Sequence, residues 1–243
     1  ASEDNKKIGN ILLEKNKNFK GNIYGINPKW GAAYGRDFYP NISSLPEVPD
    51  IAVFAIPEIF IYDALEEAWK YGIKKAIIIT AGFKEIWNIE WEKRLQTIAK
   101  KYNIRILGPN CLGYWDTSKW LNLSFGGNFF DRGNIGIISQ SGAMAVAITD
   151  ILAERNLGFS TFFSLGNKSD IDESDILREL YDDPYTSVVC MYLESISRGK
   201  LFIEKLQQLT SKKPVIIMIG GVSEKGKIAT ASHTGSISWS KEM

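Results

Sequence analysis

Several residue types and patterns are scarce in this chain of 243 residues. It has one histidine and two cysteines, and no apolar stretch reaches the about 18–20 residues that span a bilayer. Its 29 basic and 28 acidic side chains give a net charge of +1 at pH 7, which argues against nucleic-acid binding and electrostatic membrane binding. Two cysteines form no disulfide framework, so a cytoplasmic location is expected. No metal site is predicted.

Strands and helices are predicted to alternate along the chain. The strands are rich in Ile and Val and almost continuously apolar, which is typical of parallel sheets buried on both faces. Strands are expected at 22–27, 51–57, 75–80, 104–107, 134–140, 159–164, 187–194 and 214–219, and helices at 9–18, 61–71, 88–102, 142–155, 172–181 and 198–209. This alternation predicts an α/β fold with two tandem domains and mainly parallel sheets.

The alternation breaks between residues 113 and 133, where Gly, Asp, Asn and Ser accumulate. Such a composition is typical of a segment that crosses between domains. We therefore predict one domain at residues 1–120 and a second at 121–243. The first domain opens without the strand that usually precedes its first helix, and the second stops soon after Ser236, so both are expected to be truncated at the chain ends.

His233 is the candidate nucleophile. It follows the predicted strand at 214–219 within a stretch, residues 220–236, that is almost empty of large apolar side chains. Small residues leave a loop free to move and let its backbone approach a ligand. Since imidazole titrates near neutral pH, a neutral nucleophile is available there. A solvated surface histidine is the alternative, and the composition of the loop favours the functional interpretation.

Two stretches at predicted strand ends of the second domain contain candidate binding or catalytic residues. Ser139-Gln-Ser-Gly-Ala143 opens a helix, whose free N–H groups and positive end form an anion site at Ser141 and Gly142. Ser141 acting as an N-cap, worth about 1 kcal/mol, is compatible with that role. Glu194 follows an apolar strand and is costly to bury without a partner. It either accepts the ring N–H of His233 or is a solvated end-of-strand residue, and both interpretations stay open here.

The residues at other predicted strand ends are less specific indicators of function. Cys111 is either a thiol nucleophile or, more commonly for cysteine, a small buried hydrophobe. Asn110 either binds a carbonyl group or holds its turn. In the first domain, several residues at strand ends or helix starts together fit a nucleotide-like ligand, although Pro and Gly at such places are often only turn formers. These residues are Ser2, Asn27, Lys29, Pro57 and Ala81.

An ordered series of motifs resembles a known family. The series comprises Ile78-Ile-Thr-Ala-Gly-Phe83, Gly108-Pro-Asn-Cys111, Ile137-Ile-Ser-Gln-Ser-Gly-Ala143, Ser164-Leu-Gly-Asn167 and Ser232-His-Thr-Gly-Ser236. At this order and spacing the chain resembles the α subunit, or α region, of NDP-forming acyl-CoA synthetases. That family contains succinyl-CoA synthetase and ADP-forming acetyl-CoA synthetase, and the ADP-forming branch is the more similar.

The resemblance implies a Rossmann-like CoA-binding domain followed by a flavodoxin-like ligase domain with a phosphohistidine loop. It makes His233 the phosphorylated residue and Glu194 its supporting carboxylate, and it assigns phosphate binding to Ser141 and Gly142. Asn110 becomes a neighbour of the active site. CoA contacts are implied at Ser2, Asn27, Lys29, Pro57 and Ala81. ADP or ATP and Mg²⁺ are expected on a partner ATP-grasp β subunit or domain, within a hetero-oligomer.

The activity implied is an acid–CoA ligase that interconverts acyl-CoA, ADP and phosphate with acid, CoA and ATP. Two alternatives belong to other classes: a CoA-sensing regulatory module without catalysis, and an acyltransferase that depends on Cys111. His233 argues against the sensor, since sensing requires no phosphoryl acceptor. The identity of the acyl group is not predicted.

Overall fold

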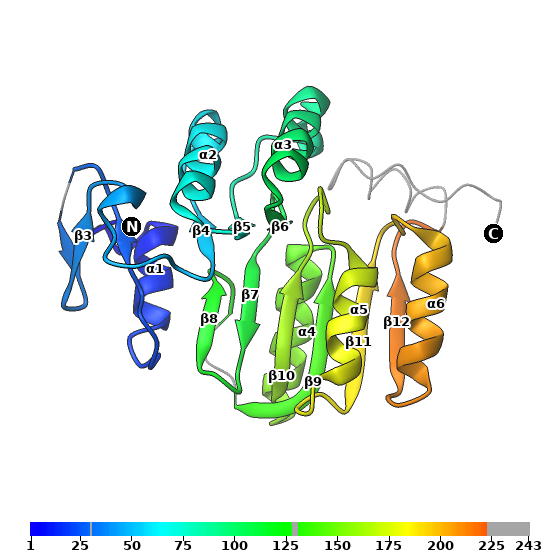
Figure 1. Cartoon of the computed structure of the whole chain (residues 1–243). Coiled ribbons are helices and arrows are strands. Elements are labelled where there is room, and N and C mark those ends of the chain that lie inside the picture. The colour runs from blue at the N-terminus through cyan, green and yellow to red at the C-terminus, as the bar shows by residue number, and fades with distance from the viewer. Residues whose placement is uncertain (30, 128–130, 223–243) are drawn as a thin grey trace.

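The computed structural model describes residues 1–29, 31–127 and 131–222 (Figure 1). The helices are α1 (Ile8–Lys15), α2 (Ile61–Tyr71), α3 (Ile89–Tyr102), α4 (Gly142–Glu154), α5 (Glu173–Asp182) and α6 (Gly199–Thr210), with 3-10 turns η1 (Ile42–Ser44), η2 (Glu58–Phe60) and η3 (Lys84–Ile86). Within these described ranges, no helix is long and apolar enough to cross a membrane.

The strands form three sheets. Their bounds are β1 (Gly25–Ile26), β2 (Ala32–Ala33), β3 (Arg36–Tyr39), β4 (Ala52–Phe54), β5 (Lys75–Ile78), β6 (Arg105–Leu107), β7 (Gly113–Asp116), β8 (Leu121–Ser124), β9 (Arg132–Ser139), β10 (Phe159–Ser164), β11 (Val188–Leu193) and β12 (Val215–Ile219). The sheet orders are β1-β3-β2, β4-β5-β6 and β12-β11-β9-β10-β7-β8. An α/β fold with mainly parallel sheets is thus confirmed.

In the first domain, the parallel sheet β4-β5-β6 carries α2 and α3 on one face. Apolar side chains at the three- and four-residue spacing of a helix bury the inner stripe of α2, including Ile61, Leu65 and Ala68. Gly72 then adopts a left-handed conformation with φ of 110°, which ends the helix. The remaining strands of this domain, β1 to β3, form a separate small sheet rather than joining β4.

In the second domain, four parallel strands lie in the spatial order β10-β9-β11-β12. The chain leaves β9 towards β10 and later returns to the other side of β9 with β11, so the connecting helices cover opposite faces. Helices α5 and α6 pack over Ile138 of β9, whereas α4 packs over Ile137. Figure 1 shows α5 and α6 in front of this sheet.

Residues 113–124 form a hairpin, not the irregular crossing segment that their composition suggested. Strand β7 pairs antiparallel with β10, and β8 pairs antiparallel with β7. The expected boundary between residues 120 and 121 therefore falls inside this hairpin, and strand pairing assigns residues 113–120 to the larger sheet. The polar residues are explained by the turn, because the Asp116 carboxylate accepts hydrogen bonds from the backbone N–H groups of Ser118 and Lys119.

The two domains are joined by specific contacts. Asn16, at the end of α1, donates through its amide nitrogen to the carbonyl oxygen of Asn122 at 2.6 Å, and the backbone N–H of Asn122 donates back to the Asn16 amide oxygen at 2.8 Å. Ile77, Leu107 and Cys111 lie in one buried cluster with residues of β9, β11, α5 and α6. The sheet edges of both domains are therefore fixed relative to each other.

Candidate functional site

The carboxyl ends of β9 and β11 lie side by side at the point where the strand order reverses. Ser139 pairs with Tyr192, and the next residue, Gln140, donates its backbone N–H to the Tyr192 carbonyl oxygen at 2.9 Å. In open parallel sheets, ligands bind beyond the strand ends at this reversal. Ser141 follows β9 and Glu194 follows β11, so the fold brings together two of the predicted site residues.

The start of α4 is a capped helix N-terminus. Ser141 is the N-cap, and its hydroxyl oxygen accepts a long hydrogen bond, 3.4 Å, from the backbone N–H of Met144. Its carbonyl oxygen accepts from the Ser139 hydroxyl at 2.7 Å, which fixes the turn. The first N–H groups of the helix, beginning at Gly142, carry partial positive charge. The capping role of Ser141 is confirmed, and phosphate binding at this helix start stays a prediction.

Glu194 is buried, with 2% of its surface exposed. The interpretation of Glu194 as a solvated end-of-strand residue is therefore wrong. Burial, together with the negative charge and hydrogen bonding of Glu194, raises the pKa of the Tyr192 hydroxyl. A Cβ atom placed on Gly220 would lie 3.4 Å from Glu194 Cγ and only 2.5 Å from the Tyr192 hydroxyl oxygen. A side chain at position 220 would therefore displace the Tyr192 hydroxyl, while its contact with Glu194 would be an ordinary van der Waals contact.

His233 lies outside the described residues. Its role as a nucleophile and its pairing with Glu194 stay predictions. The chain does, however, leave β12 beside Glu194, because the backbone N–H of Gly220 donates to the Leu193 carbonyl oxygen at 2.8 Å.

The predicted CoA-contacting residues fall into two groups. At the N-terminus, the Ser2 hydroxyl accepts from the backbone N–H of Asp4 at 3.1 Å. Nearby, the Asn27 side chain donates to the Ala1 carbonyl oxygen at 3.3 Å and accepts from the backbone N–H of Lys29 at 3.0 Å. These polar contacts shape a turn around the first residues and place Ser2, Asn27 and Lys29 on it.

The second group lies at the ends of β4, β5 and β6. The Thr80 hydroxyl donates to the carbonyl oxygen of Ile56, next to Pro57, at 2.7 Å. The carbonyl oxygen of Thr80, next to Ala81, accepts from the backbone N–H of Asn110 at 2.9 Å. Pro57, Ala81 and Asn110 thus lie at one edge of the sheet, as expected for residues that follow parallel strands.

Asn110 also joins the two domains. Its side-chain nitrogen donates to the Asn167 amide oxygen at 3.3 Å. The turn at Gly166 adopts φ of +56°, and a Cβ there would lie 2.3 Å from the Pro109 carbonyl oxygen. A residue larger than glycine would therefore push the two turns apart. Asn110 therefore links the turn after β6 to the turn after β10, and a direct contact of Asn110 with substrate stays a prediction.

Comparisons with known proteins cover almost the whole chain. Residues 1–115 match the model of a CoA binding domain, and residues 132–243 match that of a succinyl-CoA ligase like flavodoxin domain. The chain is 44% identical to an ADP-forming acetate–CoA ligase of Methanocaldococcus jannaschii, over 98% of this chain and 34% of that protein. It is 38% identical to the α subunit of ADP-forming acetate–CoA ligase II of Pyrococcus furiosus, over 99% and 53%.

The structural comparison agrees. Acetyl-coenzyme A synthetase 1 of Candidatus Korarchaeum cryptofilum, in complex with phosphate and ADP, matches with a TM-score of 0.94 and 40% identity, over 99% of this chain and 53% of that chain. The chain belongs to the NDP-forming acyl-CoA synthetases. It corresponds to their α region, and it spans about a third to a half of the length of these relatives.

Cys111 has none of the properties of a nucleophile in this synthetase fold. It is 5% exposed, and burial raises the pKa of its thiol to about 12, so thiolate is scarce at neutral pH. Its sulfur instead lies 3.4 Å from the Ile78 carbonyl oxygen and packs in the core between the domains. The environment of Cys111 does not favour the acyltransferase alternative.

Replacing Cys111 with alanine is therefore expected to leave the rate of acyl-CoA-dependent phosphorylation within about twofold of the original, because a small buried side chain is lost without loss of a reacting group. The single-turnover rate of phosphorylation from acetyl-CoA and radiolabelled phosphate measures this, and thermal unfolding reports any loss of packing. A rate reduced more than tenfold in a protein with unchanged unfolding would restore the acyltransferase hypothesis.

Sequence reasoning missed a polar network between the domains. Asn167, 1% exposed, donates through its side-chain nitrogen to Glu85 at 2.7 Å and to Glu92 at 2.9 Å. Glu85 also accepts from the backbone N–H groups of Gly82 at 2.5 Å and Phe83 at 3.1 Å, beside Ala81. Asn167 is the last residue of the motif Ser164-Leu-Gly-Asn167, one of those that carry the family resemblance. Its place in that motif was the sequence signal that could have pointed to the network. The turn after β5 is thereby tied to the turn after β10.

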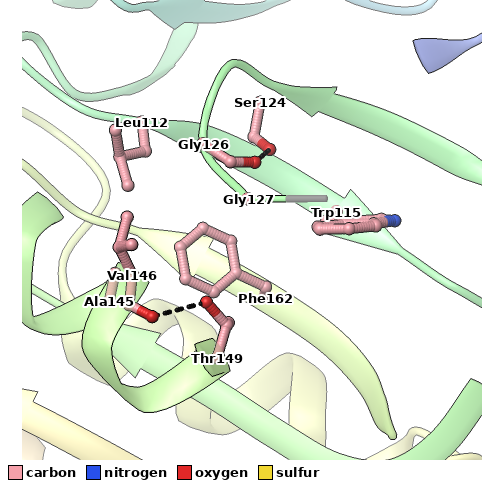
Figure 2. Close-up of a pocket in the computed structure, with 9 residues that line it drawn as sticks. All are labelled: Leu112, Trp115, Ser124, Gly126, Gly127, Ala145, Val146, Thr149 and Phe162. Atoms are coloured by element: carbon pink, nitrogen blue, oxygen red, sulfur yellow. Dashed lines mark hydrogen bonds between the residues drawn. The ribbon is translucent and has the colours of Figure 1, made fainter. Parts of the chain in front are cut away.

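A small cavity lies beneath the start of α4 (Figure 2). Its volume is about 10 Å³, which is roughly the space for one water molecule. It is lined by Leu112, Trp115, Ser124, Gly126, Gly127, Ala145, Val146, Thr149 and Phe162. Figure 2 shows the Phe162 ring and the Thr149 side chain facing this space, with the Thr149 hydroxyl bonded back to its own helix. The cavity is too small to hold an acyl group or CoA.

Over residues 1–29, 31–127 and 131–222, no group of three or more His, Cys, Asp or Glu side chains is arranged to hold a metal ion. Mg²⁺ is preferentially bound by carboxylates together with substrate phosphates. The described residues therefore do not fit a resident Mg²⁺ site, and no step below is assigned to one.

Proposed function

We propose that this chain is the α component of an ADP-forming acid–CoA ligase, which interconverts acyl-CoA, ADP and phosphate with acid, CoA and ATP. One observation carries the proposal: the start of α4 at Ser141–Gly142 and the buried Glu194 carboxylate lie at neighbouring strand ends of one sheet. A site for phosphate beside a negative charge fits a phosphoryl group that passes to a histidine.

The first step is attack by phosphate on the thioester. A phosphate oxygen bonds to the acyl carbonyl carbon, the C–S bond breaks, and the departing CoA thiolate takes up a proton. The N–H groups at the start of α4 hold the phosphate and stabilise its charge. The products are acyl phosphate and CoA.

In the second step, the neutral ring of His233 attacks the phosphorus, the bond from phosphorus to the acyl oxygen breaks, and the acid leaves as a carboxylate. The phosphorylated ring gains positive charge, which the buried Glu194 carboxylate stabilises. In the third step, a terminal oxygen of ADP attacks the phosphorus, the P–N bond breaks, and ATP leaves neutral imidazole behind. Each step runs in both directions.

CoA is proposed to lie along the first-domain turns at Ser2, Asn27, Lys29, Pro57 and Ala81. The match of residues 1–115 to a CoA binding domain supports this assignment. The ammonium group of Lys29 is the cation of this set and is suited to a phosphate group of CoA.

The nucleotide and Mg²⁺ are proposed to bind an ATP-grasp β subunit or domain, in a cytoplasmic hetero-oligomer. The relative from Pyrococcus furiosus is named as an α subunit, and the match to this chain covers 53% of it. Phosphohistidine must therefore reach ADP across a boundary between components, and residues 220–236 are proposed to carry it.

Replacing Glu194 with glutamine is expected to slow phosphorylation of His233 roughly 100-fold, because the amide keeps hydrogen bonding but lacks the charge that stabilises the ring. The measurement is the rate of acid-labile, base-stable label from acetyl-CoA and radiolabelled phosphate, in the protein with its partner. The matched control is Glu204→Gln on α6, where the carboxylate side chain is 57% exposed.

An unchanged labelling rate in the Glu194 variant would remove Glu194 from the mechanism. The same assay separates the alternatives for the whole chain. A stable acyl-cysteine would support the acyltransferase, and CoA binding without any covalent label would support the sensor.

A further inference from the structure

The turn that carries Glu194 is held by the side chain of the residue that directly follows β9, Gln140. The Gln140 amide oxygen accepts hydrogen bonds from the backbone N–H groups of Glu194 at 2.9 Å and Ser195 at 3.1 Å. Its amide nitrogen donates to the Ser195 hydroxyl at 3.1 Å. Gln140 is 3% exposed and directly precedes Ser141. One side chain thus ties the carboxylate-bearing turn to the phosphate-binding helix start.

The opposite side of the same turn is held from the loop after β10. Lys168 donates from Nζ to the Ser195 carbonyl oxygen at 2.7 Å and to the Glu173 carboxylate at 2.9 Å. The second oxygen of Glu173 accepts from the backbone N–H of Ser197 at 2.8 Å. The backbone N–H of Ser195 is therefore hydrogen-bonded to Gln140, and its carbonyl oxygen is hydrogen-bonded to Lys168.

The Lys168–Glu173 ion pair is almost fully buried, with side chains 3% and 0% exposed. Burial lowers the pKa of Lys168, and the charge of Glu173 opposes that shift. Buried ion pairs contribute little net stability compared with apolar residues of similar volume, and their best-supported role is to specify one geometry. This pair directs hydrogen bonds onto the chain segment that directly follows Glu194.

The support for Lys168 extends to the first domain. Its neighbour Asn167 is bonded to Glu85 and Glu92, and the Lys84 ammonium group bridges the Asn167 carbonyl oxygen and Glu92. The loop that presents Lys168 is thus anchored beside the turn at Ala81. Glu92 lies in α3 and Glu173 in α5, so the loop is bonded to two helices, and supporting contacts of this kind hold a reacting group in place.

We propose that Gln140 and Lys168 are positioning residues that clamp the Glu194–Ser195 turn and aim the Glu194 carboxylate at the phosphoryl-transfer site. The inference deepens the proposed function and rests on it. Neither side chain is assigned to touch substrate. Their effect is geometric, since a displacement of about 1 Å of a reacting group costs on the order of 100-fold in rate.

The test combines Gln140→Met and Lys168→Met, each alone and each together with Glu194→Gln, in the complete protein with its partner. The measured quantity is the single-turnover rate of histidine phosphorylation from acetyl-CoA and phosphate, with CoA affinity and thermal unfolding measured in parallel. Thr186→Val is the matched control. Thr186 is 3% exposed and shares a 2.6 Å hydrogen bond with Ser160, but it lies before the opposite end of β11.

Each single clamp variant is expected to slow phosphorylation roughly 100-fold with CoA affinity unchanged, whereas Thr186→Val affects only unfolding. In the Glu194→Gln background, the clamp variants are expected to add little further loss, because they act through the same carboxylate.

If Gln140→Met and Lys168→Met both phosphorylate His233 at the rate of the unchanged protein while Glu194→Gln is slow, the clamp proposal is wrong and the proposed function is unaffected. Fully additive losses in the double variants would show a role independent of Glu194 and would also overturn the clamp. An unaffected Glu194→Gln protein would instead overturn the function assigned to Glu194, and the clamp with it. If Lys168→Met does not fold, Gln140→Met and its double variant decide the question.

Discussion

Replacing His233 with alanine is expected to abolish ATP formation from acyl-CoA, ADP and phosphate. Alanine offers no nitrogen to accept the phosphoryl group, so the path through a covalent intermediate closes. Loss of the nucleophile in such a path lowers the rate on the order of 10⁴-fold or more. Acid-labile, base-stable label on the protein should disappear together with ATP.

CoA affinity provides the internal control for this variant. The predicted CoA contacts lie in the first domain, at turns far from His233 in sequence, so the affinity should stay within roughly a factor of two. Isothermal titration with CoA measures it directly. If ATP formation persists in a protein that carries alanine at position 233, the phosphohistidine assignment is wrong, whatever the CoA affinity.

Local sequence signals were sufficient for most of the secondary structure. Helix α2 and strand β10 begin and end at the predicted residues. For α2 the signals are a regular apolar spacing and Gly72 just beyond the helix, and both act within a few residues. The hairpin of β7 and β8 was missed although these strands pair locally, and its place in the larger sheet depends on β10, which lies far along the chain. Trp115, buried at 3%, gave an apolar signal that the surrounding Gly, Asp and Ser residues obscured.

For the candidate site too, the sequence indicated features that depend on local segments and missed contacts between distant ones. Ser141 and Glu194 could be proposed from the sequence because a cap before a helix and a carboxylate after an apolar strand are visible in single segments, and the structure shows the cap and the burial of the carboxylate. The clamp was not found, since Lys168 and Ser195 are 27 residues apart and a lone lysine in a polar loop is normally solvated. Only the tertiary fold brings Lys168 next to Glu173 and makes its burial tolerable.

The chain by itself is expected to make no ATP from acyl-CoA, ADP and phosphate. The start of α4 is proposed to hold a phosphoryl group, but over residues 1–29, 31–127 and 131–222 no cluster of acidic side chains fits the metal that phosphoryl transfer to a nucleotide uses. Under the proposed function, the metal site and the binding site for ADP lie on a separate ATP-grasp component. Addition of an ATP-grasp β subunit should therefore start ATP synthesis.

Formation of phosphohistidine without ADP distinguishes a chain that lacks only its partner from a chain that is inactive. Acetyl-CoA and radiolabelled phosphate contain everything needed to form phosphohistidine, so the chain alone should acquire acid-labile label while ATP stays absent. ADP added later should remove that label only when the partner is present, because the P–N bond breaks when ADP accepts the phosphoryl group. Ready ATP synthesis by the purified chain without any partner would contradict this division of labour and would require a nucleotide site within the chain itself.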